Sequence, residues 1–116
     1  MTKNILANNP VYVVGIGFHR YQRTSSQSYV SLGLAATREA LKDAAIGWPG
    51  VEVAYTGTAM LGMGASRIML SRLGATGIPM TQIENASASG SSAVALASLE
   101  IASGKSFLIE NTKFNL

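Results

Sequence analysis

The chain has 116 residues, enough for one domain with one modest core. Charged residues make up only 13% of it, and the lysines and arginines behind its net charge of +3 are scattered, which argues against nucleic-acid binding. The absence of cysteine excludes disulfides, thiolate zinc sites and a cysteine nucleophile. A single histidine argues against a histidine-based metal site, so we expect no metal and no cofactor.

The first half of the chain predicts one strand and one helix. Residues 11–16 form a short β-branched run typical of a strand buried on both faces, and the polar stretch 18–27 predicts a loop. Residues 28–46 have the apolar stripe of a core-facing helix, with Ser28 as its N-cap and Gly47 at the position of a left-handed C-cap. This helix lacks the basic face of a membrane-surface helix.

The second half predicts further strands separated by helices. Strands are expected at 51–56 and 78–85, with a short helix at 65–73 between them. Pro79 places the later strand at a sheet edge or a strand start, because proline cannot donate a ladder hydrogen bond. A fourth strand is expected to start within 106–109, ahead of a polar, unpatterned tail.

The segment 87–103 predicts a helix that is apolar on all sides, with Glu100 as its only charged residue. Such a helix is normally buried all round and needs a layer of protein on each side. A lone domain of this size can hardly supply both layers, so we infer missing structure or a partner. The predicted order βαβαβαβ indicates an α/β fold with a parallel sheet and right-handed crossovers.

Two glycine- and serine-containing segments could carry chemistry. Gly15-Ile16-Gly17 follows the first predicted strand, but Arg20 stands where a dinucleotide fingerprint needs its third glycine. The simpler interpretation is that these glycines relieve crowding at a strand end. Residues 85–92, rich in serine, join a strand to a helix N-terminus, where backbone N–H groups and the helix dipole favour negative charge.

A serine in that second segment is a weak nucleophile without a nearby base, and His19 is far away in sequence. The alternative is that Ser87 or Ser89 caps the helix. His19 itself is expected to be an exposed loop residue, and Tyr55 to pack on a half-buried strand. The methionines are interpreted as adaptable core or interface filler; they are Met60, Met63, Met69 and Met80.

The run Asn85-Ala86-Ser87-Ala88-Ser89-Gly90 resembles the Asn-x-Cys-Ala-Ser-Gly motif of the thiolase family, which opens the buried third helix of its N-terminal half. Residues 13–17 and 64–70 resemble the first strand and second helix of the same fold. The resemblance covers residues 11–105 and points to the sterol-carrier/lipid-transfer branch, including thiolase-like steroid side-chain aldolases. It implies a partial thiolase-like half over residues 1–105, followed by a divergent tail, 106–116.

The resemblance places Ser87 at the family's nucleophile position, with Asn85, Ala88, Ser89 and Gly90 completing the motif. It implies kinship with acyl-CoA or sterol-CoA acyltransferases, or with lipid-transfer aldolases. Those aldolases lack the cysteine and cleave β-hydroxyacyl-CoA by a retro-aldol step with a small OB-domain partner. The family's catalytic histidine lies in a half that this chain does not cover, so we expect no turnover from the chain alone.

The resemblance also implies a homodimer formed through the strand from Ile78 to Glu84, which pairs across the dimer interface in the thiolase fold. Acyl-CoA or sterol-CoA would be the ligands of the full-length relatives. The alternatives are a non-catalytic interaction or dimerisation module, or a truncated remnant. No apolar run reaches 18 residues, and the N-terminus does not predict a signal peptide, so we expect a cytoplasmic protein.

Overall fold

A parallel three-stranded sheet lies at the centre of the computed structural model, which describes residues 4–23 and 26–113. The strand order is β2-β1-β3, with β1 at Val53–Gly57, β2 at Met80–Ile83 and β3 at Ile109–Lys113. Both neighbours run parallel to β1, so that Ala54 pairs with Met80 on one side and with Glu110 on the other. The expected α/β class with a parallel sheet is confirmed.

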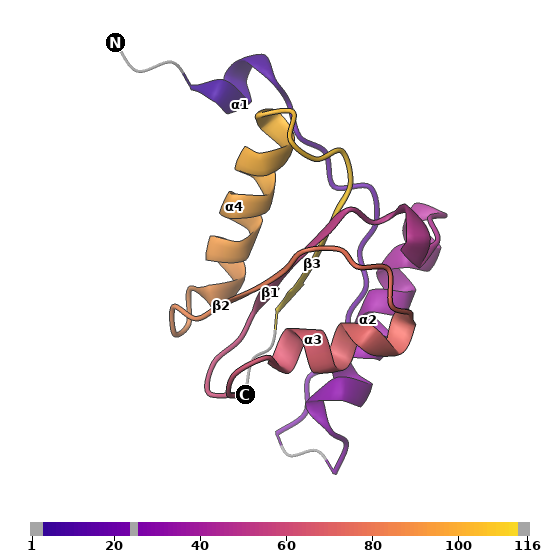
Figure 1. Ribbon diagram of the computed structural model, residues 1–116. Coiled ribbons are helices and arrows are strands. Elements are labelled where there is room, and N and C mark those ends of the chain that lie inside the picture. The colour runs from indigo at the N-terminus through magenta and orange to yellow at the C-terminus, as the bar shows by residue number, and fades with distance from the viewer. Residues whose placement is uncertain (1–3, 24–25, 114–116) are drawn as a thin grey trace.

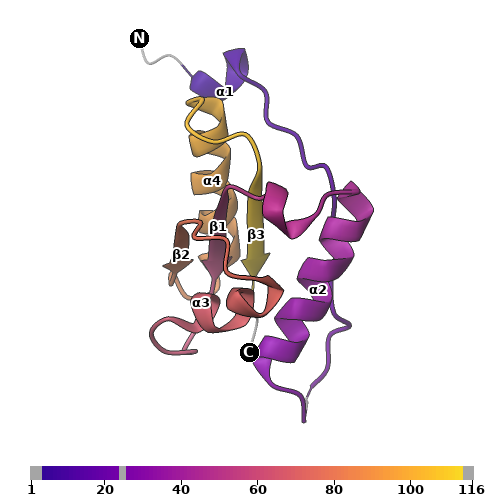
Figure 2. The ribbon, with the colours of Figure 1, turned by 45° about the vertical axis from the view of Figure 1, so that its right-hand side comes forward.

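Helices cover the two faces of this sheet unequally (Figure 1). Two helices, α2 (Tyr29–Ala44) and α3 (Ala65–Leu70), lie on one face, while α4 (Ser89–Ala102) stands alone on the other (Figure 2). The short α1 (Ile5–Asn8) rests against the C-terminal end of α4. No helix in the described ranges is long and apolar enough to cross a membrane.

The hydrophobic core fills the space between the sheet and the pair α2 and α3. Met69 and Leu70 of α3 are completely buried there, and burying each side chain contributes about 1.5–3 kcal/mol. The Trp48 indole N–H, in the 3₁₀ turn η1 (Trp48–Gly50), donates to the Gly74 carbonyl at 3.0 Å. The buried members of this core are Leu34, Trp48, Val51, Ala54, Met69 and Leu70.

Several predicted elements are confirmed with small shifts of their ends. The strand expected at 51–56 is β1, and the strand expected at 78–85 is β2, which begins directly after Pro79 at an edge of the sheet. The helix expected at 65–73 divides into α3 and the 3₁₀ turn η2 (Ser71–Leu73), with Gly74 following. The tail, by contrast, is not unpatterned, because β3 continues through it to residue 113.

The strand predicted at 11–16 is wrong. This segment pairs with no strand of the described chain, and Tyr12 and Val13 expose 75% and 81% of their surface. It runs along α2 instead, where a Cβ on Gly17 would lie only 2.2 Å from the Ala36 carbonyl oxygen. The apolar run therefore has no vacant place beside β1, since β2 and β3 occupy both edges of that strand. The glycines do relieve crowding, but against a helix.

The predicted N-cap of α2 is confirmed, and its predicted C-cap is wrong. Ser28 Oγ accepts the Ser31 backbone N–H at 3.2 Å. The left-handed residue at the other end is Ala45, with φ of 56°, whereas Gly47 has φ of −82°. The Ile46 N–H donates back to the Leu41 carbonyl at 3.0 Å, so the helix closes two residues before the glycine.

The prediction that α4 is buried on every side is also wrong for this chain. Its sheet-facing side, including Ala93, Ala97 and Glu100, is buried. Val94 and Leu99, on other sides, expose 54% and 46% of their surface, because only one sheet packs against the helix. Met69 is buried and Met80 is half-buried, so both fill the core as predicted. Met60 and Met63 are 93% and 99% exposed, so the prediction that they are core residues is wrong.

Candidate functional site

The loop that joins β2 to α4 lies at the carboxyl ends of β1 and β2; we call residues 84–88 the Ser87 loop. The Thr58 N–H donates to the Ile83 carbonyl at 2.9 Å and keeps these two strand ends together. Gly57 ends β1, and a Cβ there would lie 2.7 Å from the Ser89 carbonyl oxygen. Only glycine therefore lets the first turn of α4 approach the strand this closely. Ligands of open parallel sheets bind beyond this end of the strands.

Ser89 holds the Ser87 loop in place. Its side chain is completely buried, and its Oγ accepts the Asn85 backbone N–H at 2.8 Å. The same hydroxyl lies 2.8 Å from the Ala86 carbonyl oxygen and 3.0 Å from that of Thr58, to either of which it can donate. One buried hydroxyl thus ties the loop to the helix start and to the residue after β1.

Neither serine caps α4, contrary to the alternative drawn from the sequence. The N-cap position belongs to Ala88, which provides no side-chain hydrogen bond. Ser87 lies outside the helix and is exposed, in an isolated bridge with Asn85. The Asn85 amide reaches across the loop and donates to Ser92 Oγ at 3.1 Å. The motif residues therefore build the loop, and Ser87 is left at its exposed tip.

Ala86 gives the Ser87 loop its sharp turn. Its φ is 47°, in the left-handed region that costs a residue with a side chain about 1–2 kcal/mol. The hydrogen bonds of Ser89 hold this conformation, and such strain is often found where a chain presents a functional group. Ser87 then comes two residues before α4, whose positive dipole end favours negative charge within about one turn.

The structure does not bring the single histidine to this loop. His19 belongs to the segment that packs along α2, and α2 and α4 lie on opposite faces of the sheet (Figure 2). The ring Nδ1 of His19 lies 3.0 Å from the Arg20 carbonyl oxygen, and the residue is half-buried rather than exposed as expected. Among the described residues, no group of three or more possible ligands could hold a metal ion.

Sequence comparison identifies relatives, although no protein-family model matches the chain. The chain is 36% identical over 96 residues to benzoylsuccinyl-CoA thiolase subunit BbsB of Thauera aromatica, and the match covers 81% of this chain and 25% of that protein. It is 31% identical over 102 residues to non-specific lipid-transfer protein-like 2 of Caenorhabditis elegans, covering 85% and 25%. The chain is therefore similar in sequence to proteins of the thiolase superfamily. It spans about a quarter of the length of these two relatives.

Solved structures of thiolase-like proteins share the fold of this chain. The priming β-ketosynthase of the R1128 polyketide pathway matches 87% of it with a TM-score of 0.73 at 19% identity, over 41% of the ketosynthase. The Ltp2–ChsH2(DUF35) aldolase matches 83% with a TM-score of 0.67 at 20% identity, over 25% of that chain. The 3-oxoacyl-[acyl-carrier-protein] synthase III of Aquifex aeolicus matches 78% at 0.65 and 18% identity, over 30% of that chain.

A second polar cluster holds α4 against the sheet. The Tyr55 hydroxyl donates to the Glu100 carboxylate, which also accepts Ser106 Oγ at 2.5 Å and lies 3.9 Å from the Lys105 ammonium. The hydrogen bond to Glu100, burial and the carboxylate charge raise the pKa of Tyr55 to about 12. Hydrogen bonds from Ser106 and Tyr55 lower the pKa of Glu100. Tyr55 packs on the strand, as predicted.

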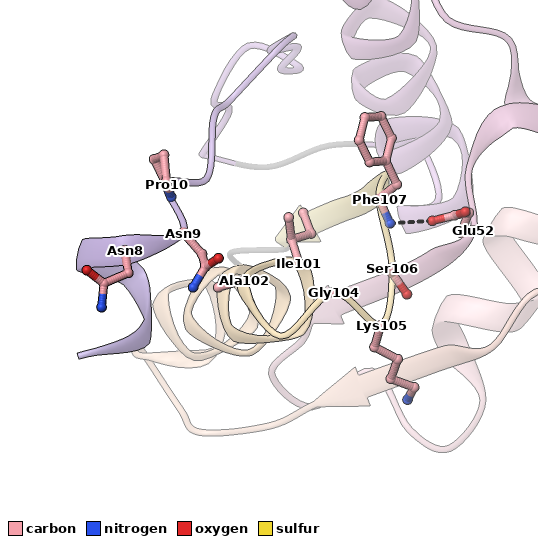
Figure 3. A pocket seen from close by; sticks show the side chains of 10 residues that line it. All are labelled: Asn8, Asn9, Pro10, Glu52, Ile101, Ala102, Gly104, Lys105, Ser106 and Phe107. Carbon is pink, nitrogen blue, oxygen red and sulfur yellow. Dashed lines mark hydrogen bonds between the residues drawn. The ribbon is translucent and has the colours of Figure 1, made fainter. Parts of the chain in front are cut away.

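An open pocket of about 440 Å³ lies at the other end of α4 from the Ser87 loop (Figure 3). Glu52 forms part of its wall and accepts the Phe107 backbone N–H at 2.5 Å. Since α4 is about 20 Å long, this pocket is separate from the loop. Its lining consists of Asn8, Asn9, Pro10, Glu52, Ile101, Ala102, Gly104, Lys105, Ser106 and Phe107.

Sequence reasoning found the Ser87 loop but missed two residues that shape it. Gly57 provides the close approach of β1 and α4, and Thr58 provides the carbonyl beside the Ser89 hydroxyl. The available signal for Gly57 was a glycine directly after the strand predicted at 51–56. Nothing local in the sequence indicates the second, because its partner lies 31 residues away.

Proposed function

We propose that this chain is a thiolase-like protein related to acyl-CoA or sterol-CoA acyltransferases and lipid-transfer aldolases, and that alone it turns over no thioester. The observation behind this is Ser87, at the family's nucleophile position, on a loop to which the structure brings no histidine. The names of the relatives, a CoA thiolase subunit and a lipid-transfer-like protein, support the substrate class. Asn85, Ala88, Ser89 and Gly90 then act as positioning residues.

The helix dipole cannot replace the missing base. A favourable N-terminal position contributes about 0.3–1 kcal/mol to an anion, which is less than one unit of pKa. A serine hydroxyl needs a positioned base to attack a thioester, whereas a cysteine at such a helix start is readily ionised. The alkoxide of Ser87 is therefore out of reach at neutral pH.

Thioester cleavage tests this proposal directly. The purified chain is expected to cleave acetoacetyl-CoA, with free CoA as acceptor, and a β-hydroxyacyl-CoA at the uncatalysed rate. Product formation followed by chromatography is the measurement, and Ser87→Ala should give the same background. Turnover that Ser87→Ala abolishes would show that the serine is a working nucleophile, and the proposal would be wrong.

A Ser87→Cys variant tests the environment of the loop. Its thiol should react with iodoacetamide at pH 7 about tenfold faster than that of Ser103→Cys, because the dipole favours a thiolate at one end of α4 and disfavours it at the other. Both serines are exposed, and the chain has no other cysteine, so each variant reports one thiol. Equal rates would mean that the helix start does not act on residue 87.

Interaction is the second component of the proposal. We propose that the strand from Ile78 to Glu84 pairs with a second copy, since β2 is an edge strand with no described strand on its outer side. A small OB-domain protein is the proposed partner in a larger assembly, supported by the matched aldolase, whose name joins two proteins. We also propose a cytoplasmic location. The boundary between the thiolase-like part, residues 1–105, and the divergent tail, residues 106–116, stays part of the proposal.

A further inference from the structure

Residues 11–16 form an apolar segment that lies beside the sheet without pairing to it. Val13 exposes 81% of its surface, and no described strand pairs with the segment. Contacts with α2 hold it instead. A Cβ on Gly15 would lie 2.5 Å from a backbone oxygen of that helix, and the Ile16 N–H donates to Asp43 Oδ2 at 2.9 Å. A close glycine contact and one hydrogen bond therefore replace a strand ladder here.

The segment already runs in the direction of the strands. Gly15 lies against Ala44, and Gly17 lies against Ala36, so the segment is antiparallel to α2. Figure 2 shows that α2 is in turn antiparallel to β1 and β3. The segment is therefore parallel to both strands, as a strand added to this sheet would be.

The segment and β3 occupy neighbouring sides of α2. Thr37 Oγ1 of the helix lies 3.3 Å from Thr112 Oγ1 of β3. Ala40, which faces the segment, comes three residues after Thr37, and a helix of about 3.6 residues per turn places the two roughly 60° apart around its axis. A sideways shift past α2, without reversal of the chain, would therefore bring the segment to the position of β3.

The strand β3 fills its place in the sheet with polar side chains. Glu110 and Thr112 are only 9% and 6% exposed, and Glu110 Oε2 has no hydrogen-bond partner in the described chain. Burying a polar group without a partner is unfavourable, whereas burying apolar side chains is favourable. The β-branched residues among 11–16 also favour a strand. A poorly suited strand thus holds this edge of β1 while a better suited segment lies nearby.

The strand β1 has two edges, and β2 holds one of them. We propose that residues 11–16 and β3 are alternative partners for the other edge, and that the segment enters the sheet when β3 leaves it. The segment is long enough to span β1, which has five residues, and residues 17–28 provide its connection to α2. The exchange releases the tail strand while the core keeps a strand beneath α2.

Thiol labelling of Thr112→Cys measures the release of β3, because the chain has no cysteine of its own. Thr112 is 6% exposed, so iodoacetamide reaches a thiol there when β3 leaves the sheet. Adding Val13→Asp should slow labelling at least about tenfold, since α2 and α4 cover both sides of this position and would bury the new carboxylate. Tyr21→Asp, at a residue outside the segment that is 80% exposed, is the matched control and should change nothing.

Two adjacent prolines, in the double variant Asn111→Pro/Thr112→Pro, remove β3 as a strand. Neighbouring strand residues point their N–H groups to opposite edges, so one of the two prolines deletes a donor toward β1. Hydrogen exchange followed by mass spectrometry should then show the amides of residues 11–16 protected at least about tenfold more than in the wild-type chain, with cooperative melting retained. Adding Val13→Asp should abolish both the protection and the cooperative melting.

Three results would overturn the exchange. Equal labelling of Thr112→Cys with and without Val13→Asp would mean that β3 leaves without a replacement. If the double-proline variant fails to fold, or folds without protecting residues 11–16, the segment cannot take this edge of β1. None of these assays depends on residue 87 or on the outer edge of β2, so their failure would leave the proposed function standing.

Discussion

Replacing Glu110 by glutamine is expected to stabilise the chain by about 3 kcal/mol at pH 8 and to remove most of the pH dependence of its unfolding. Glu110 lies on β3 and exposes 9% of its surface, between the sheet and α2. One carboxyl oxygen accepts the Thr112 hydroxyl, whose Oγ1 is 3.3 Å from that of Thr37, and the other oxygen has no hydrogen-bond partner. Burial raises the pKa of Glu110 to about 7, because the hydrogen bonds with Thr112 and Thr37 lower this pKa by less than burial raises it.

The direction of this pH dependence follows from proton binding in the folded and unfolded chains. The unfolded carboxyl titrates near 4.5 and the folded one near 7, so the folded chain holds this proton more tightly. Its contribution to stability is fully present below pH 4.5 and is lost as the pH rises to about 7. No charged side chain of α2 or β1 faces this carboxyl from the described residues, and Glu100 lies on the opposite face of the sheet.

Urea unfolding at pH 5 and pH 8 measures this effect. The wild-type midpoint should fall between the two pH values, while that of Glu110→Gln should change little, since glutamine fills the same volume without an ionisable group. Glu39→Gln removes the same charge from the exposed side of α2 and is the control, expected to behave like the wild type. Identical pH dependence of Glu110→Gln and the wild type would mean that Glu110 is not buried in its protonated form.

Local features were predictable from sequence because their partners are near in the chain. Ser28 caps α2 through Ser31, three residues away, and Pro79 marks the start of β2. The strand predicted at 11–16 failed for the opposite reason. Its β-branched run reports a preference for extended, buried backbone, but pairing depends on which edge of β1 is vacant, and a polar segment from the tail occupies that edge.

The uniform apolar pattern of α4 shows a related limit. The pattern predicts a helix that is buried on every side, yet Val94 and Leu99 are exposed in this chain. Periodicity does not indicate whether the covering layer belongs to the same molecule. The inference of missing structure or a partner stays a prediction.

At the candidate site, the motif located the Ser87 loop but not its internal geometry. The serines suggested that Ser87 or Ser89 caps α4, but the N-cap residue is Ala88. The Ser89 hydroxyl instead bonds the Asn85 backbone N–H and the carbonyl groups around it. The left-handed backbone of Ala86 also had no sequence signal, since alanine rarely adopts it. Such features arise from contacts between β1 and α4, which a linear motif does not contain.

Gly57→Ala is expected to destabilise the chain by about 2 kcal/mol and to displace the Ser87 loop. The added Cβ would lie 2.7 Å from the Ser89 carbonyl carbon and oxygen and 2.8 Å from the Gly90 nitrogen. All three are backbone atoms at the start of α4, so no side-chain rotation relieves the contact. Either the strand end or the helix start must move, and the buried hydrogen bond from Ser89 to Thr58 is then lost.

Thermal melting and thiol reactivity together test this contact. A loss of about 2 kcal/mol lowers the melting temperature of a domain this size by roughly 10 °C. Gly47→Ala is the control, because its Cβ would meet only Pro49 Cδ at 3.6 Å and its φ is ordinary. In a Ser87→Cys background, Gly57→Ala should also slow alkylation, since the helix start no longer faces residue 87 in the same way. Unchanged melting and alkylation would mean that α4 does not rest on the end of β1, and the geometry assigned to the Ser87 loop would lose its support.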